Sequence, residues 1–199
     1  MKKIAIFIDG GYIHSGVSMM KRRPTMHMQD YVERIAHSCA TANEEVVRIL
    51  YYDCPLFNGT VTTPISKQQT TFTSDSSWLD KLAKKDLFAV RRGQLRFRGW
   101  ALKKDFQQNG PLQDSDFKPN FQQKGVDMRI GLDMAIYTAN KSVDLLALMT
   151  NDTDFIPPMK HARREGMQVA LLSLPHVGKR IATGLLEHAD YHRPIGWPT

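Results

Sequence analysis

Short apolar runs that end at an aspartate recur along this chain. Residues 4–8 (Ile-Ala-Ile-Phe-Ile) and 46–52 (Val-Val-Arg-Ile-Leu-Tyr-Tyr) have the length and composition of buried parallel strands, and Asp9 and Asp53 follow them. Apolar residues at helical spacing predict an amphipathic helix between the two runs, near residues 31–39. This βαβ pattern constrains the fold strongly, because parallel strands need a crossover that returns over the sheet.

The same alternation continues through the second half of the chain. Helices are predicted over 126–139 and 155–165, and strands over 145–149 and 169–172. We therefore predict a three-layer α/β/α fold with a mainly parallel central sheet. The 199 residues fit a single domain, 1–199, that is long enough to bury about 70% of its unfolded surface.

The middle of the chain is predicted to be less regular. Residues 54–75 are rich in Thr, Ser, Pro and Gln and are expected to form a polar excursion, a flexible loop on the substrate side. A short helix is expected from Ser76 or Ser77, followed by strands at 87–90 and 94–97 that pair as a hairpin around Gly93. Residues 103–123 are polar and are expected to be an exposed connector.

Aspartates stand at three places where a strand or loop gives way to a helix. They are Asp9, Asp127 and the pair Asp152 and Asp154. The carboxyl ends of parallel strands share one edge of the sheet, so these side chains are expected to meet there. Carboxylates gathered in a protein of net charge +7 predict a divalent-metal site that acts on a phosphate-rich substrate.

Simpler roles for these aspartates stay open at this point. Asp152 or Thr153 could serve only as a helix N-cap, and Asp127 only as a favourable charge in a first helical turn. Asp53 has the position of a site residue but also that of a turn former. Asp133 follows Asp127 by six residues, or about 240° around a helix, and is expected to face away from it.

Positive charge is concentrated between residues 81 and 104. The basic residues are Lys81, Lys84, Lys85, Arg91, Arg92, Arg96, Arg98, Lys103 and Lys104, with Asp86 as the acid. Interleaved Phe88, Phe97 and Trp100 suit a surface on which bases stack while cations contact phosphates. The alternative is a solvated hairpin whose aromatic residues are core.

Several other classes of protein are disfavoured. No apolar run approaches the roughly 18 residues of a membrane span, and Asp9 interrupts the first apolar run too early for a signal peptide. Cys39 and Cys54 form no Cys-x-x-Cys motif, which favours a reducing cytoplasm. His188 and His192 have zinc spacing but are interpreted as surface or partner-facing residues, and nucleotide-binding glycine motifs are absent from the sequence.

Taken in order, these motifs resemble those of a known family. Phe7-Ile8-Asp9-Gly10-Gly11, Lys124-Gly125-Val126-Asp127 with Asp133, and Thr150-Asn151-Asp152-Thr153-Asp154-Phe155-Ile156-Pro157 with Gly166 resemble the NYN domain family. The similarity is to its LabA-like (DUF88) branch, within the PIN-like nuclease superfamily, and it spans nearly the whole chain. Many relatives have asparagine where this chain has Tyr12, whose hydroxyl could still donate a hydrogen bond.

The resemblance implies a PIN-like fold and a metal-dependent endoribonuclease. Asp9, Asp127 and Asp152 would hold Mg²⁺ or Mn²⁺, and Asp154 would orient the attacking water. Residues expected to contact the RNA, which is expected to be single-stranded, are Tyr12, Arg91, Arg92, Arg96, Lys124, Thr150 and Asn151. The alternatives are an RNA-binding or protein-interaction regulator with little turnover, and a phosphohydrolase of small phosphate esters. The sequence does not decide whether the chain forms a homo-oligomer.

Overall fold

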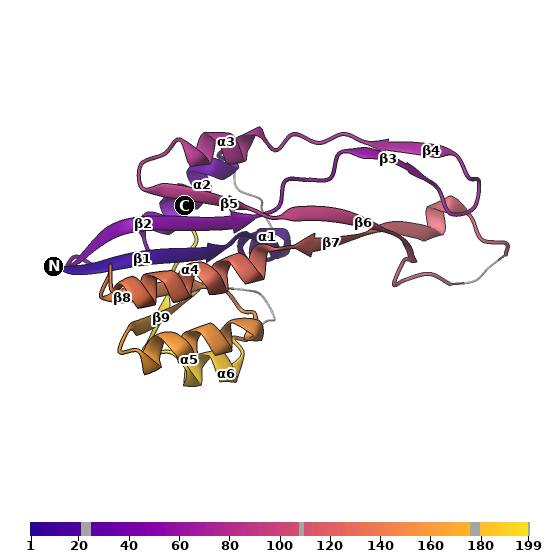
Figure 1. The fold of residues 1–199 in the computed structure, drawn as a ribbon. Coiled ribbons are helices and arrows are strands. Elements are labelled where there is room, and N and C mark those ends of the chain that lie inside the picture. Colours follow the sequence, from indigo (N-terminus) through magenta and orange to yellow (C-terminus); the bar gives the residue numbers. More distant parts are fainter. Residues whose placement is uncertain (21–24, 108–109, 176–179, 199) are drawn as a thin grey trace.

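The computed structural model describes residues 1–20, 25–107, 110–175 and 180–198. Its centre is a six-stranded sheet in the order β10-β9-β8-β1-β2-β5, in which all five pairings are parallel (Figure 1). The strands are β1 (Lys2–Asp9), β2 (Glu44–Asp53), β5 (Phe88–Arg92), β8 (Leu145–Met149), β9 (Gln168–Ser173) and β10 (Tyr191–Pro194). The predicted mainly parallel sheet is confirmed.

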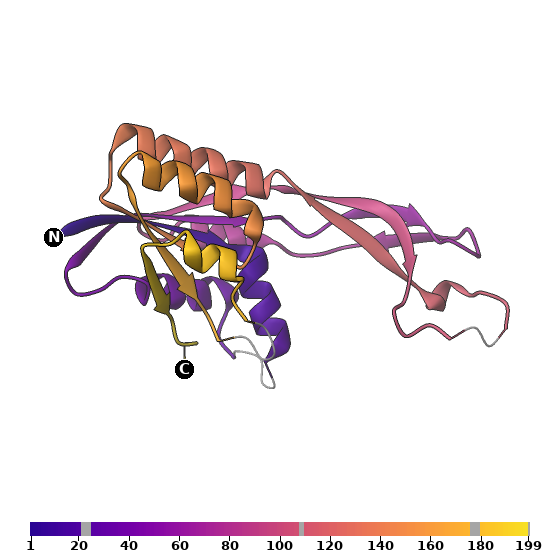
Figure 2. The same cartoon turned by 90° about the horizontal axis from the view of Figure 1, so that it is seen from below.

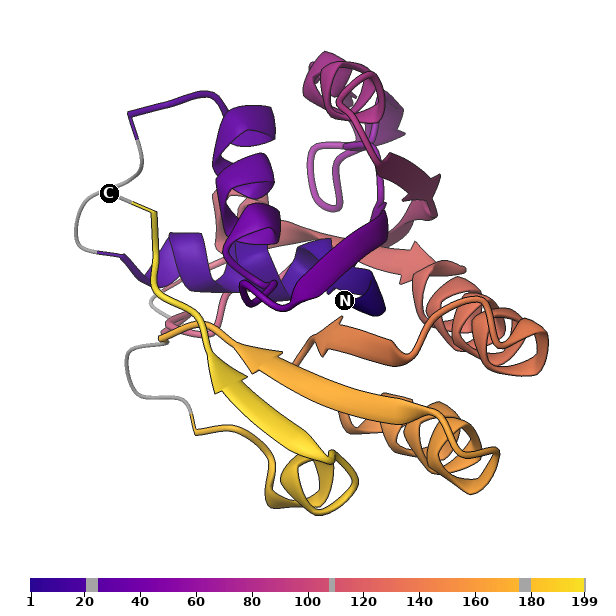
Figure 3. The same ribbon diagram turned by 90° about the vertical axis from the view of Figure 1, so that its left-hand side faces the viewer.

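Helices cover both faces of this sheet, which confirms the predicted three layers. One face carries α1 (Gly10–Met19), α2 (Met28–His37) and α3 (Ser77–Ala83), and the other carries α4 (Val126–Asn140), α5 (Ile156–Arg164) and α6 (Thr183–Glu187). A view along the sheet separates the two layers (Figure 3). Among the described residues, no helix is both long and apolar enough to cross a bilayer.

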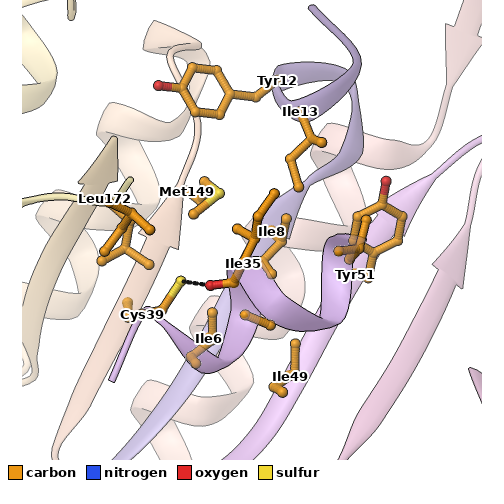
Figure 4. Close-up of a cluster of buried hydrophobic side chains, with 14 of the residues drawn as sticks. Ile6, Ile8, Tyr12, Ile13, Ile35, Cys39, Ile49, Tyr51, Met149 and Leu172 are labelled. Carbon is orange, nitrogen blue, oxygen red and sulfur yellow. Dashed lines mark hydrogen bonds between the residues drawn. The ribbon is translucent and has the colours of Figure 1, made fainter. Parts of the chain in front are cut away.

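Alternation along β1 divides the core into two parts. Ile4, Ile6 and Ile8 face the α1–α3 side, whereas Ala5 and Phe7 face the α4–α6 side, and all five are fully buried. Figure 4 shows the first part, in which isoleucines from β1, β2 and α2 pack together. A strand that is buried on both faces in this way holds its carboxyl end in a fixed position.

A two-layered arm extends from the carboxyl edge of the sheet (Figures 1 and 2). It consists of two antiparallel hairpins, β3 (Gly59–Thr62) with β4 (Gln69–Phe72) and β6 (Gln94–Leu102) with β7 (Phe117–Lys124). Its rings are in mutual contact at centroid distances of 5.4–6.4 Å, and they belong to Phe57, Phe72, Phe97, Trp100 and Phe121. This aromatic cluster is a small core that joins the two hairpins.

The arm corrects three predictions for the middle of the chain. Residues 87–90 and 94–97 do not pair with each other, because β5 joins the parallel sheet beside β2 and β6 pairs with β7. The 54–75 excursion contains β3 and β4 rather than a flexible loop. The 103–123 connector holds most of β7 and a 3-10 turn, η1 (Asp114–Asp116), and its residues 108–109 lie outside the described part.

The sequence analysis placed a helix start at Asp9 without giving the extent of α1, and it missed α6 and β10. Helix α1 follows β1 directly, although its three glycines lower its helix propensity. Strand β10 includes residues of the 188–192 tail and lies at the sheet edge, where His192 Nε2 and Ser173 Oγ are 2.8 Å apart. Helix α1 and strand β10 owe their conformation to packing against the sheet rather than to local preference.

Candidate active site

The site lies where β1 and β8 end, beneath the base of the arm. Register places Ile8 opposite Met149, so Asp9 and Thr150 are the next residues along the two strands. Asp9 caps α1, and its Oδ1 accepts a hydrogen bond from the Gly11 backbone N–H at 2.9 Å. Its Oδ2 accepts from the Thr150 hydroxyl at 3.0 Å.

Thr150 connects two of the predicted carboxylates. The side chain is buried, and its hydroxyl oxygen also accepts a hydrogen bond from the Asp152 backbone N–H at 3.1 Å. Asp152 in turn caps the 3-10 turn η2 (Thr153–Phe155), accepting from the Asp154 N–H at 2.9 Å. One hydroxyl therefore fixes Asp9 relative to the segment that carries Asp152 and Asp154.

Asp127 approaches from a third element. It lies in the first turn of α4, after Gly125 enters the helix with a left-handed φ of 80°. Unlike Asp9 and Asp152, it caps no helix, and the described residues give it no hydrogen-bond partner. Its carboxylate is exposed, yet it interacts electrostatically with Asp152 and Asp154.

The carboxylates of the site influence one another's pKa values. Burial raises the pKa of Asp9 from 3.8 to about 6, hydrogen bonds from Thr150 and the backbone partly oppose this, and the Asp127 charge adds to it. Burial also raises the pKa of Asp127, as do the charges of Asp152 and Asp154. Negative charge is therefore concentrated at this edge of the sheet, because the charges that raise the pKa values of Asp9 and Asp127 are those of other carboxylates.

We tested whether these residues suit a divalent ion. In the described part of the chain, no three His, Cys, Asp or Glu side chains lie close enough together to enclose a metal. Mg²⁺, however, usually keeps several waters and binds one or two carboxylates together with substrate phosphates. Oxygen donors with upward-shifted pKa values are chemically suited to such an open site, because a cation would relieve the repulsion between them.

A second polar cluster lies beside Asp9, and the sequence analysis considered its Asp53 but not its His14. Asp53 is 3% exposed and accepts hydrogen bonds from Tyr51 Oη at 3.1 Å and the Cys54 N–H at 2.7 Å. His14 Nε2, one turn into α1, lies 2.7 Å from Asp53 Oδ2. Burial lowers the pKa of His14, but the hydrogen bond and charge of Asp53 outweigh it, so the pKa is raised above 6.5.

His14 was missed because no sequence spacing links it to Asp53. Gly10 makes the contact possible, since a Cβ atom there would lie 2.8 Å from Asp53 Cγ. The Gly10-Gly11 pair after Asp9 was a usable signal: it indicates close packing of another group against the start of this helix.

The predicted arginines separate in space. Arg91 Nε lies 3.1 Å from Asp133 Oδ2, and Asp133 also accepts from Tyr52 Oη at 2.8 Å. Asp133 thus anchors β2 and β5 to α4, away from the carboxylates, as its helical position predicted. Arg92 pairs with Asp80 of α3 at 2.5 Å, whereas Arg96 lies on the arm.

Two other residues that were predicted to contact RNA make hydrogen bonds within the protein instead. Tyr12 is buried, and its hydroxyl accepts from the Leu174 N–H at 3.0 Å. Asn151 Oδ1 accepts from the Ala182 N–H at 3.0 Å, which ties η2 to the segment before α6. Lys124 is exposed at the end of β7, beside the start of α4. Of these three side chains, Lys124 alone is directed to solvent.

The aromatic side chains of the basic segment make contacts within the protein. Phe88 is 6% exposed in the core, and Phe97 and Trp100 lie in the aromatic cluster of the arm. Trp100 Nε1 also donates to the Thr62 carbonyl at 2.8 Å. These contacts favour the alternative in which the aromatic residues form a core, because the two hairpins share the rings of Phe97 and Trp100, and the stacking of bases on them stays a prediction.

A family model and a protein of known sequence are similar to the chain. The family model described as "NYN domain" matches residues 3–196. An uncharacterized protein of Methanocaldococcus jannaschii, MJ0482, is 29% identical over 80 residues, which are 40% of this chain and 32% of that protein. The chain thus aligns with about a third of the length of this curated relative.

Proposed function

The chain belongs to the NYN domain family, part of the PIN-like nuclease superfamily, and from this premise we propose that it is an endoribonuclease dependent on Mg²⁺ or Mn²⁺. The observation that carries the proposal is the Thr150 hydroxyl, which joins Asp9 to the Asp152 segment at the carboxyl edge of the sheet. We further propose that the chain lies in the LabA-like branch and acts in the cytoplasm, where its two buried free cysteines stay reduced.

In this proposal Asp9, Asp127 and Asp152 hold the metal, directly or through water. The ion would lower the pKa of a bound water and neutralise charge that develops on the phosphate. Asp154 orients the attacking water, and Lys124 contacts the phosphate. The hydroxyl of Thr150 keeps Asp9 in position by donating to its Oδ2, rather than by touching RNA.

One observation favours the second candidate, an RNA-binding regulator with little turnover. Asp9 and Asp152 already serve as helix caps, and the described carboxylates do not form an enclosed metal cage. These two residues therefore have a structural role that does not require catalysis. The nuclease and the regulator differ in whether the protein cleaves the RNA that it binds.

The deciding experiment follows cleavage of labelled single-stranded RNA and matching DNA with Mn²⁺, Mg²⁺ or EDTA. We expect metal-dependent cutting of RNA that Asp127→Asn, Asp9→Asn and Asp152→Asn each reduce at least about a hundredfold, since several kcal/mol of charge stabilisation are lost. Asparagine remains a good N-cap, so the last two variants keep their helix starts. Asp86→Asn, at an exposed carboxylate outside the site, is the matched control.

Each alternative has its own outcome. Tight, salt-sensitive binding without cutting in any metal would establish the regulator. Turnover of mononucleotides with no preference for polymer would establish a small-ester phosphohydrolase.

A further inference from the structure

One face of the β6–β7 hairpin is polar and basic. Arg96 and Arg98 are exposed, whereas Phe97 between them packs into the aromatic cluster against the β3–β4 hairpin. On β7, Gln122 and Lys124 are exposed, and register pairs Arg96 with Gln122 and Gln94 with Lys124. Residues that are directly opposite in an antiparallel pair share a face. We call this set (Gln94, Arg96, Arg98, Gln122 and Lys124) the outer face of the arm.

Within the described ranges, the arginines of the outer face contact glutamines rather than carboxylates. Arg96 Nε donates to Gln94 Oε1 at 2.9 Å, and Arg98 Nε donates to Gln122 Oε1 at 2.8 Å. Neither arginine pairs with a carboxylate within the described ranges, whereas Arg91 and Arg92 both do. The glutamines orient the two guanidinium groups and leave their terminal N–H groups for an anion.

The outer face leads into the acidic site. Lys124 precedes Asp127 by three residues, and Gln123 Oε1 lies 3.8 Å from the place of a Cβ atom on Gly11, beside the Asp9 cap. Figure 1 shows β3 and β4 over one side of β6 and β7, while the other side faces the half of the molecule that contains α5. The view from below agrees, with β6 and β7 in front of β3 and β4 (Figure 2).

We propose that the outer face binds the backbone of single-stranded RNA on one side of the scissile bond and so sets a minimum substrate length on that side. This proposal rests on the proposed function. Four residues separate Gln94 from Arg98, a span of about 13 Å, or roughly four stacked nucleotides. Because the aromatic rings are packed within the arm, recognition uses phosphates and is independent of base sequence.

Binding of a single-stranded RNA of about sixteen nucleotides, measured in EDTA, tests the surface without cleavage. We expect the double variant R96Q/R98Q to bind roughly tenfold more weakly at low salt. We also expect the slope of log K against log salt to fall by about 1.4, which corresponds to two lost phosphate contacts. The control K81Q/K84Q removes the same charge from the α3 region and should shift affinity much less. Equal effects of the two variants would overturn the proposal.

Cleavage then tests the one-sided length requirement. The substrates are RNAs with a single cleavable position. An RNA that carries about four or more nucleotides on the side of the scissile bond that reaches the arm should be cut efficiently. RNA extended only on the opposite side should be cut poorly by the wild type, and R96Q/R98Q should reduce this difference between substrates. Equal cutting of both substrates would refute the role of the arm but leave the nuclease intact. Absence of cutting by the wild type would refute the nuclease, and the binding measurement would still decide whether the arm holds RNA.

Discussion

The buried, charged carboxylate of Asp9 destabilises the folded protein, and a bound cation would offset this cost. Because its pKa is about 6 in the folded protein and 3.8 in the reference state, its contribution to stability is greatest below pH 3.8 and is lost as pH rises through about 6. In EDTA at pH 7.5 we expect Asp9→Asn to raise the free energy of unfolding by on the order of 1 kcal/mol, with no gain at pH 3.5. Urea unfolding at the two pH values measures this, and a loss of stability at pH 7.5 would contradict it.

The contribution of His14 to stability should also be lost as pH rises, but for a different reason, because here a base is held by an acid. Its raised pKa means that the His14–Asp53 interaction stabilises the fold fully below pH 6.5 and weakens as pH rises through the folded pKa. We expect His14→Gln to destabilise the protein more at pH 6 than at pH 9, measured by thermal unfolding. His37→Gln, at an exposed histidine at the end of α2, is the control. A loss that does not depend on pH would refute this account.

Thr150 shows a limit of sequence reasoning at the scale of residues. The aspartates were found because strand ends and helix starts predict where carboxylates meet, but the hydroxyl that joins them was interpreted as a substrate contact. We expect Thr150→Val to destabilise the protein by about 1–3 kcal/mol, since Asp9 loses a buried hydrogen bond, whereas Thr150→Ser should keep most of the stability. Chemical denaturation compares the two, and equal losses would contradict the bridging role.

At the scale of elements, strands that are buried on both faces were predictable and the arm was not. Runs such as Leu145–Met149 are short and continuously apolar, as buried parallel strands tend to be, and their place between predicted helices favours a strand. The pairing of β6 depends on β7, and a long connection that local turn signals do not encode separates the two strands. Gly93 suggested a hairpin turn, but its N–H donates to the Asp53 carbonyl at 2.8 Å, and the chain passes directly from sheet to arm.

Glycine is required at position 93, where the chain passes from β5 to β6, because atoms of three other segments pack against it. A Cβ atom there would lie 2.6 Å from Val126 Cγ2, 2.8 Å from Cys54 Sγ and 2.8 Å from the Lys124 carbonyl. We expect Gly93→Ala to cost about 1–3 kcal/mol through overpacking. Gly131→Ala, within α4 and 3.9 Å from Pro158, should be neutral or stabilising by up to about 1 kcal/mol. Calorimetry that finds the two variants equally stable would refute the packing argument.

At the scale of the whole molecule, the arm has a core that is separate from the two cores of the body. The aromatic cluster contains none of the buried residues that line the sheet. We expect Phe121→Ala to raise amide hydrogen exchange in β3, β4, β6 and β7 while β1 and β8 stay protected, because stability is local to each core. Uniform loss of protection across the chain would show instead that arm and body unfold together.

The double use of Asp9 and Asp152 as helix caps affects how sequences of this kind should be compared. A descendant that no longer cuts RNA would still need a capping residue at both positions, either aspartate or asparagine, so a capping residue there says little about whether the chain cuts RNA. Asp127 caps nothing and sits in a solvated first turn that many residues tolerate. Among homologous chains, replacement of the aspartate at the position of Asp127 is therefore the clearer sign that nuclease activity has been lost.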